Sequence, residues 1–174
     1  MKRILSFTIA ALLLVVASAA GQAKAELSFG GGIIQPTGTF GDASKTGWHG
    51  LASIAAFPGD HPIGLQGTVF YGQNNFQTGS GKTKLFGGLG ELKLEMRTDA
   101  AFKPYAVVGG GLVNAKATGG SGSTKGALDV GIGVGYIGAS KVGFFVEGRY
   151  VNVFDSGPDL QFIPISAGLR IALK

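Results

Sequence analysis

The feature that most constrains the fold of this chain is a two-residue alternation that keeps charged side chains apart from apolar ones. In the segment 142–154, Glu147 and Arg149 fall on one phase of the alternation, and the other phase is apolar. The apolar phase contains Val142, Phe144, Val146 and Tyr150. Successive side chains of a β-strand point to opposite faces. The segment therefore predicts a strand with one apolar and one charged face.

Eight segments can be read with an apolar alternation of period two. They are residues 26–34, 47–57, 63–72, 83–96, 102–116, 125–138, 142–154 and 162–173. Tilted strands that cross a bilayer need about 9–11 residues, whereas strands of globular proteins usually have about 5–6. The lengths of the segments therefore favour membrane-spanning strands. No apolar run after residue 25 is long enough for a membrane-spanning helix.

The connections between these segments alternate in length. Four long connections, 35–46, 73–82, 117–124 and 155–161, alternate with three short ones, 58–62, 97–101 and 139–141. Long loops at one end and tight turns at the other are typical of bacterial outer-membrane barrels. No helical period appears after residue 25. The sequence thus predicts an all-β fold, an eight-stranded antiparallel up-and-down transmembrane β-barrel.

The charged phase of these strands is expected to face the barrel interior. Charge is costly in hydrocarbon, so the apolar phase must face the lipid. A soluble barrel of the lipocalin kind would show the reverse arrangement, with an apolar interior. Glycines on the inward phase, such as Gly131, Gly133 and Gly135, leave room for longer side chains. The expected lumen charge cluster contains Glu91, Lys93, Glu95, Asp129, Glu147, Arg149 and Arg170.

Two roles are open for this cluster: a salt-bridged plug or a polar path for ions and small solutes. An eight-stranded barrel is only wide enough for its own side chains, and buried ions must be paired. The plug is therefore favoured over the pore. Glu147 and Arg149 cannot satisfy each other alone, so partners are expected across the lumen, such as Glu91, Lys93 and Arg170.

Aromatic residues lie mainly near the ends of the segments and predict two belts at the lipid–water interfaces. Ordinary β-propensity is the alternative explanation. Near the long connections lie Trp48, Tyr71, Phe86, Phe154 and Phe162, and near the short turns lie Phe57, Phe102, Tyr105, Tyr136 and Phe144.

The first 25 residues have the pattern of a cleaved secretory signal. Lys2 and Arg3 precede an apolar run over 9–17, and Ala23-Lys24-Ala25 matches an A-x-A cleavage site before Glu26. An earlier cut, after Ala19, and an uncleaved membrane anchor are the alternatives. We therefore expect an exported protein with a signal peptide over 1–25 and a single barrel domain over 26–174. The chain has no cysteine, so its stability does not depend on disulfides.

The sequence gives little support for catalysis, for a metal or cofactor, or for nucleic-acid binding. The two histidines, His49 and His61, are expected at opposite ends of the barrel, which argues against a shared metal site. A His49–Asp42–Ser44 arrangement is conceivable, although Asp42 and Ser44 also suit an ordinary turn. No basic cluster or aromatic motif indicates nucleic-acid binding. We therefore expect no catalytic residue, no cofactor and no metal site.

Four stretches in order along the chain resemble the bacterial outer-membrane β-barrel domain family, in the broad class of small OmpA/OmpX-like barrels. They are PTGTFGDASKTGWH (36–49), KPYAVVGGGL (103–112), FFVEGRYVNVF (144–154) and QFIPISAGLRI (161–171). The resemblance covers essentially all of 26–174. It implies a monomer that contacts outer-membrane lipid and the outer-membrane assembly machinery, with long loops open to an extracellular ligand. The expected role is structural or surface-interacting. A small porin and, with less support, a lipid-modifying barrel enzyme are the alternatives.

Overall fold

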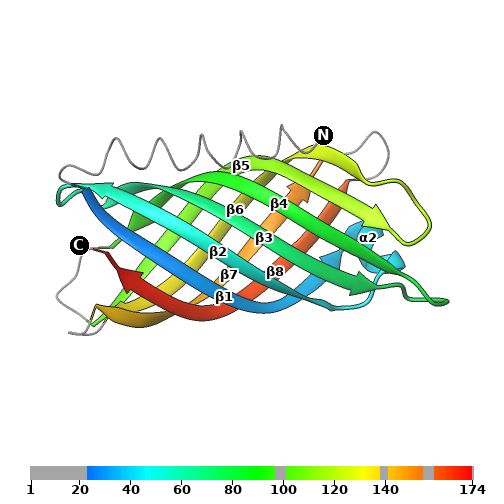
Figure 1. Ribbon diagram of the computed structural model, residues 1–174, viewed down its shortest axis with the longest axis horizontal. Helices are drawn as coiled ribbons and strands as arrows, with labels where there is room; N and C mark the ends of the chain where they lie inside the picture. The colour runs from blue at the N-terminus through cyan, green and yellow to red at the C-terminus, as the bar shows by residue number, and fades with distance from the viewer. Residues whose placement is uncertain (1–22, 97–100, 138–140, 155–158, 174) are drawn as a thin grey trace.

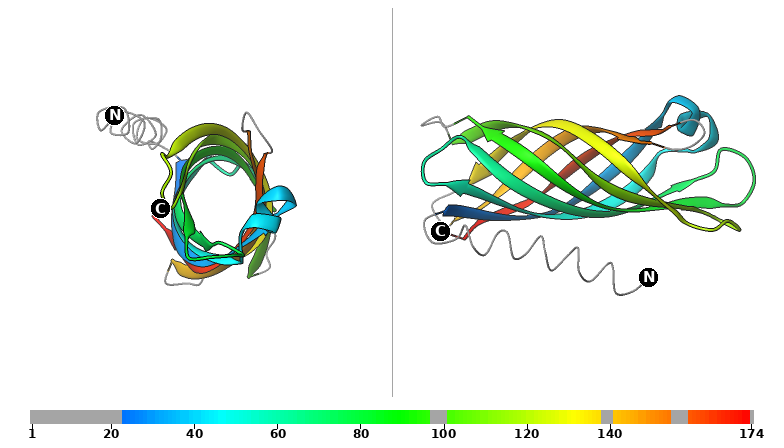
Figure 2. Two further views of the ribbon diagram at one scale, coloured as in Figure 1. Left: turned by 90° about the vertical axis from the view of Figure 1, so that its right-hand side faces the viewer. Right: turned by 90° about the horizontal axis from the view of Figure 1, so that it is seen from above.

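The chain folds into a closed barrel of eight antiparallel strands, each paired with its neighbours in sequence, and β1 closes the ring against β8 (Figures 1 and 2). The computed structural model describes residues 23–96, 101–137, 141–154 and 159–173. The expected fold class is confirmed. The strands are β1 (Ala23–Thr37), β2 (Gly47–Pro58), β3 (Ile63–Asn75), β4 (Lys82–Glu95), β5 (Phe102–Ala117), β6 (Ser123–Ile137), β7 (Val142–Val153) and β8 (Leu160–Ala172).

Most strand ends lie within one to three residues of the predicted ones, because the alternation that defines the strands also sets which residues can face the core. β1 begins at Ala23, before the predicted cleavage point between Ala25 and Glu26. Residues 1–22 of the expected signal peptide lie outside the described residues, so this processing stays a prediction. Much of the connections 97–101, 139–141 and 155–161 also lies outside the described residues.

One element was not expected from the sequence. A short helix, α2 (Gly38–Ala43), lies in the first long connection, at the end of the barrel opposite to the end of β8 (Figure 1). Six residues are too few to produce a detectable helical period. Its Phe40 side chain is buried against the apolar part of the interior. Among the described residues, no helix is both long and apolar enough to cross a membrane.

The outer face of the barrel is apolar over most of its height. Ile132 of β6 is 72 % exposed and Val130 is 51 % exposed, whereas Asp129, which precedes Val130 on the other phase of the alternation, is buried. The same separation holds in β4, where Leu92 and Leu94 are about half exposed. A band of this size is far beyond the isolated apolar residues of a soluble surface and matches the lipid-facing side of a transmembrane barrel.

The interior has two layers rather than the single polar filling that the sequence suggested. Towards the long connections, the interior is an apolar cluster: Ile34, Phe40, Phe70, Leu85, Leu89, Val113, Ala127, Val151, Val153 and Phe162. The charged side chains occupy the rest of the interior. They lie near the middle of β4, β6 and β7 or near the short-turn ends of β1, β4 and β8.

Three aromatic residues assigned to the interfacial belts were assigned wrongly. Phe57, Tyr105 and Phe162 are almost fully buried and point into the barrel. They lie near strand ends but on the inward phase of the alternation, and the phase decides the face. The other described belt residues are exposed or half-buried on the outside, and Tyr136 stacks on Phe144 with ring centroids 5.2 Å apart.

Candidate functional site

Arg149 of β7 is the centre of the first charged cluster in the interior. Its Nε donates to Glu147 at 2.5 Å, and its Nη1 donates to Asp129 of β6 at 3.0 Å and to Glu91 of β4. Glu91 also accepts hydrogen bonds from Gln66 Nε2 at 2.8 Å and from Thr68 Oγ1 at 2.7 Å, both on β3. β3 lies opposite β7 in the ring of eight. The Arg149 cluster therefore connects opposite walls of the barrel.

Arg170 of β8 is the centre of a second cluster, nearer the short turns. Its guanidinium donates to Glu26 of β1 and to Glu95 of β4, with 3.0 Å between Arg170 Nε and Glu26 Oε2. Lys93 Nζ lies 3.6 Å from Glu26 and 4.5 Å from the centre of the Tyr105 ring. A cation over an aromatic face is stabilised by the ring quadrupole. Since β4 lies opposite β8, the Arg170 cluster also crosses the barrel.

Glycines on the inward phase make these clusters sterically feasible. A Cβ atom at Gly131 would lie 2.7 Å from Cγ of Arg149, and one at Gly133 would lie 2.5 Å from Cζ of Tyr105. A Cβ atom at Gly135 would collide with the guanidinium of Arg170. β6 therefore provides the space that the long side chains of β5, β7 and β8 fill.

The structure places all seven side chains of the sequence-derived lumen cluster in the interior, but in two groups. Glu91, Asp129 and Glu147 surround Arg149, whereas Lys93, Glu95 and Arg170 belong to the second group. Of the partners expected for Glu147 and Arg149, Glu91 contacts Arg149 directly.

Two members of the second cluster were missed in the sequence. The predicted cleavage point makes Glu26 the first residue of the mature chain, and Glu26 shares the inward phase of Ser28 and Ile34 in β1. The position of Tyr105 near a strand end predicts a belt residue, but Tyr105 is on the inward phase of β5 and is buried. For both residues, the two-residue alternation of the strand predicts a position inside the barrel.

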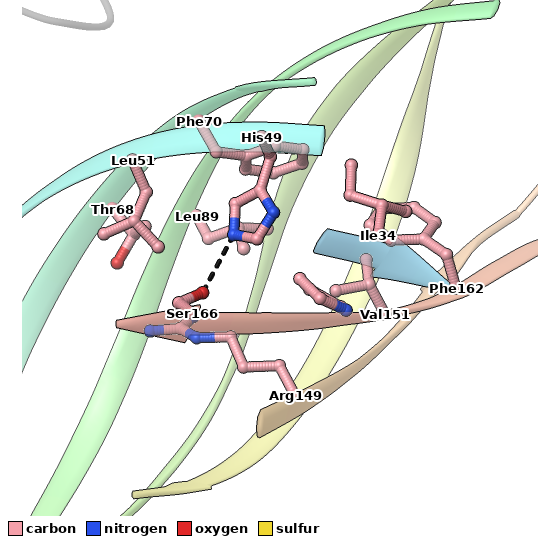
Figure 3. A pocket seen from close by; sticks show the side chains of 11 residues that line it. Ile34, His49, Leu51, Thr68, Phe70, Leu89, Arg149, Val151, Phe162 and Ser166 are labelled. Carbon is pink, nitrogen blue, oxygen red and sulfur yellow. Dashed lines mark hydrogen bonds between the residues drawn. The ribbon is translucent and has the colours of Figure 1, made fainter. Parts of the chain in front are cut away.

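A small cavity borders the Arg149 cluster (Figure 3). Its volume is about 20 Å³, and its walls include Thr68, Phe70 and Arg149 together with a pair formed by His49 and Ser166. His49 Nε2 lies 2.8 Å from Ser166 Oγ across the cavity. A space of this size holds about one water molecule. It is far too small for an organic substrate.

The conceivable His49–Asp42–Ser44 arrangement is not formed. His49 is buried and bonded to Ser166, Ser44 is buried beside its bridge partner Phe76, and Asp42 is exposed on α2. His49 is on the inward phase of β2, so its side chain points into the barrel and away from the loop end where Asp42 lies. Within the described ranges, no three metal-ligating side chains lie close enough together to hold an ion.

Comparisons with known proteins establish the fold. No protein-family model matches the chain, and no curated protein matches it in sequence. Neisserial surface protein A is 22 % identical with a TM-score of 0.65, over 86 % of this chain and 96 % of that one. The attachment invasion locus protein Ail of Yersinia pestis is 14 % identical with a TM-score of 0.51, over 86 % of this chain and 97 % of that one. The chain thus has the fold of the small eight-stranded outer-membrane β-barrels.

Proposed function

We propose that this protein is an integral outer-membrane β-barrel with a structural or surface-interaction role in the cell envelope, and that its lumen is closed to solutes. The observation that carries the proposal is the pair of guanidinium-centred clusters that join opposite walls of the barrel. The apolar layer towards the long connections fills the same lumen at a second level. No catalytic, metal or cofactor chemistry is part of this proposal.

The membrane location is supported by the distribution of polarity across the wall. Charges are buried inside, and large apolar side chains are exposed on the outside. In water, this arrangement would expose the apolar band and bury the ions. After removal of residues 1–25, the mature chain is expected in the outer-membrane fraction, with a mobility on detergent gels that changes on heating. Recovery as a soluble periplasmic protein would contradict this location.

Closure of the lumen is tested by conductance. Arg149, Arg170 and their carboxylate partners fill the cross-section that a solute would need, and the cavity beside them holds about one water. Purified, refolded barrel in a planar bilayer is therefore expected to give no reproducible channels, while a general porin in the same bilayer serves as the positive control. Large and reproducible channels would favour the small porin instead.

The surface-interaction role is supported by the long-connection end. The first two long connections are tied together there, with Lys45 N donating to Asn75 O at 2.8 Å and Gln77 N donating to Ala43 O at 2.9 Å. Loops held on a rigid scaffold are common binding sites. Replacing the exposed tip 77–80 with a Gly-Ser segment of equal length is expected to leave heat-modifiable folding intact and to reduce binding of whole cells to a surface ligand. Unchanged binding would remove this part of the proposal.

A further inference from the structure

Two lysines oppose each other on the outer face of the barrel at the long-connection end. Lys84 of β4 pairs in register with Lys116 of β5, and both side chains are exposed. Lys84 lies on the same phase as Phe86 and Leu92, which face outward. We call Lys84 and Lys116 the lysine pair.

In the part of the chain that the structure describes, no carboxylate balances the charge of the lysine pair. No ion pair joins either lysine to a carboxylate within the ranges that the structure describes. Like charges directly opposite each other on one face of a sheet are destabilising. An anion placed between the two ammonium groups would convert this repulsion into attraction.

The lysine pair lies next to the aromatic belt of the long-connection end. Two residues further from the loop and on the same face, Phe86 pairs with Tyr71 of β3 and with Asn114 of β5. The Tyr71 ring in turn lies 5.8 Å from the Trp48 ring. Aromatic belts mark the depth of the lipid headgroups, and lysines just beyond the belt extend towards them. The lysine pair is therefore at the depth where lipid phosphates lie.

An apolar groove continues from this position along the outer wall. It has a volume of about 400 Å³ and is lined by Phe29, Trp48, Tyr71 and Phe86, and Gly50, on the outward phase of β2, leaves its floor without a side chain. We call this the outer groove. Its lining is suited to a hydrocarbon chain, and its upper border is formed by Tyr71 and Phe86, the cross-strand pair next to Lys84.

We propose that the lysine pair and the outer groove together bind one phosphate-bearing acylated lipid. The phosphate lies between Lys84 and Lys116, and an acyl chain lies in the outer groove. This inference rests on the proposed membrane location. It adds a specific lipid site to a surface that would otherwise meet bulk lipid only.

The test compares two lipids with identical acyl chains, phosphatidic acid and phosphatidylcholine, by native mass spectrometry of the full barrel in detergent. The wild-type barrel is expected to retain phosphatidic acid in preference to phosphatidylcholine. The double variant Lys84→Gln/Lys116→Gln is expected to bind phosphatidic acid roughly 30-fold more weakly, since each lysine near a membrane surface adds about a factor of five in affinity for anionic lipid. The matched control Lys45→Gln/Lys141→Gln removes the same charge from exposed lysines outside the site and is expected to keep the preference.

A second variant tests the groove separately. A Cβ at Gly50 meets only the Gly30 carbonyl oxygen, at 3.8 Å, so Gly50→Phe can fill the outer groove without a backbone collision. It is expected to weaken retention of phosphatidic acid while the barrel still shifts on heating. Glycerol phosphate, which lacks the acyl chains, is expected not to displace the lipid.

The inference would be overturned by equal retention of both lipids, by no effect of the double lysine variant, or by a dimer of this chain in place of the lipid complex. Displacement by glycerol phosphate would also overturn it, because the site would then be a phosphate site only. Heat-modifiable mobility and insertion into phosphatidylcholine vesicles are measured in parallel. A barrel that inserts without lipid preference refutes this inference alone, whereas a chain that does not insert refutes the proposed membrane location.

Discussion

Arg149 is held by carboxylates from three strands, and its removal would leave those carboxylates buried without their cation. Breaking a buried ion pair on one side typically costs about 3–5 kcal/mol. Arg149→Ala is therefore expected to lower the free energy of unfolding of the refolded barrel by an amount in this range, which appears as a lower midpoint in urea. Adding Glu147→Gln should recover part of the loss, which a double-mutant cycle measures. An unchanged midpoint would mean that the side chain does not hold the interior together.

Removing the charge of Asp129 is expected not to destabilise the barrel, because the Arg149 cluster contains more carboxylates than cations. Three carboxylates share one guanidinium. Asp129→Asn removes one negative charge and keeps an oxygen that can accept from Arg149 Nη1. The variant is expected to unfold at the wild-type urea concentration or above it, in the same measurement in which Arg149→Ala is destabilised. A loss as large as that of Arg149→Ala would show that the charge of Asp129 is required.

At the scale of one element, β6 separates the two environments most clearly. Val130 is central in β6 and faces outward, whereas its neighbour Gly131 faces the Arg149 side chain. An arginine on the lipid face costs about 2–4 kcal/mol at the midplane and about 0–1 kcal/mol near the interfaces. Val130→Arg is expected to destabilise the barrel in vesicles by the larger amount, and Thr124→Arg, on the same outward phase near the exposed end of β6, by the smaller one. Equal and small effects would contradict a lipid-facing Val130.

The strands could be predicted because one signal, the alternation, decides both the strand and its faces. The same signal placed the charged residues of β4, β6, β7 and β8 inside. It also places Phe57, Tyr105 and Phe162 inside, where their position near strand ends wrongly predicts belt residues. It could not show that Arg149 meets Glu91 while Arg170 meets Glu95, since contacts across the lumen depend on the stagger of the strands. The helix α2 was missed because six residues are too short to show a period.

At the scale of the whole molecule, the closed ring leaves two chemically different ends. The described long connections, including α2, lie at one end, and the described short turn between β2 and β3 lies at the other with the end of β8 (Figure 2). In up-and-down outer-membrane barrels, the long loops are extracellular and the short turns periplasmic. We therefore expect both ends of the mature chain in the periplasm.

Single-cysteine labelling tests this orientation, because the chain has no cysteine of its own. Ser80→Cys lies in the exposed connection between β3 and β4, and His61→Cys lies in the exposed short turn between β2 and β3. On intact cells, a membrane-impermeant maleimide is expected to label Ser80→Cys and not His61→Cys, because only the first thiolate would face the medium. After lysis both should react, which controls for thiol reactivity. Labelling of His61→Cys alone on intact cells would invert the orientation.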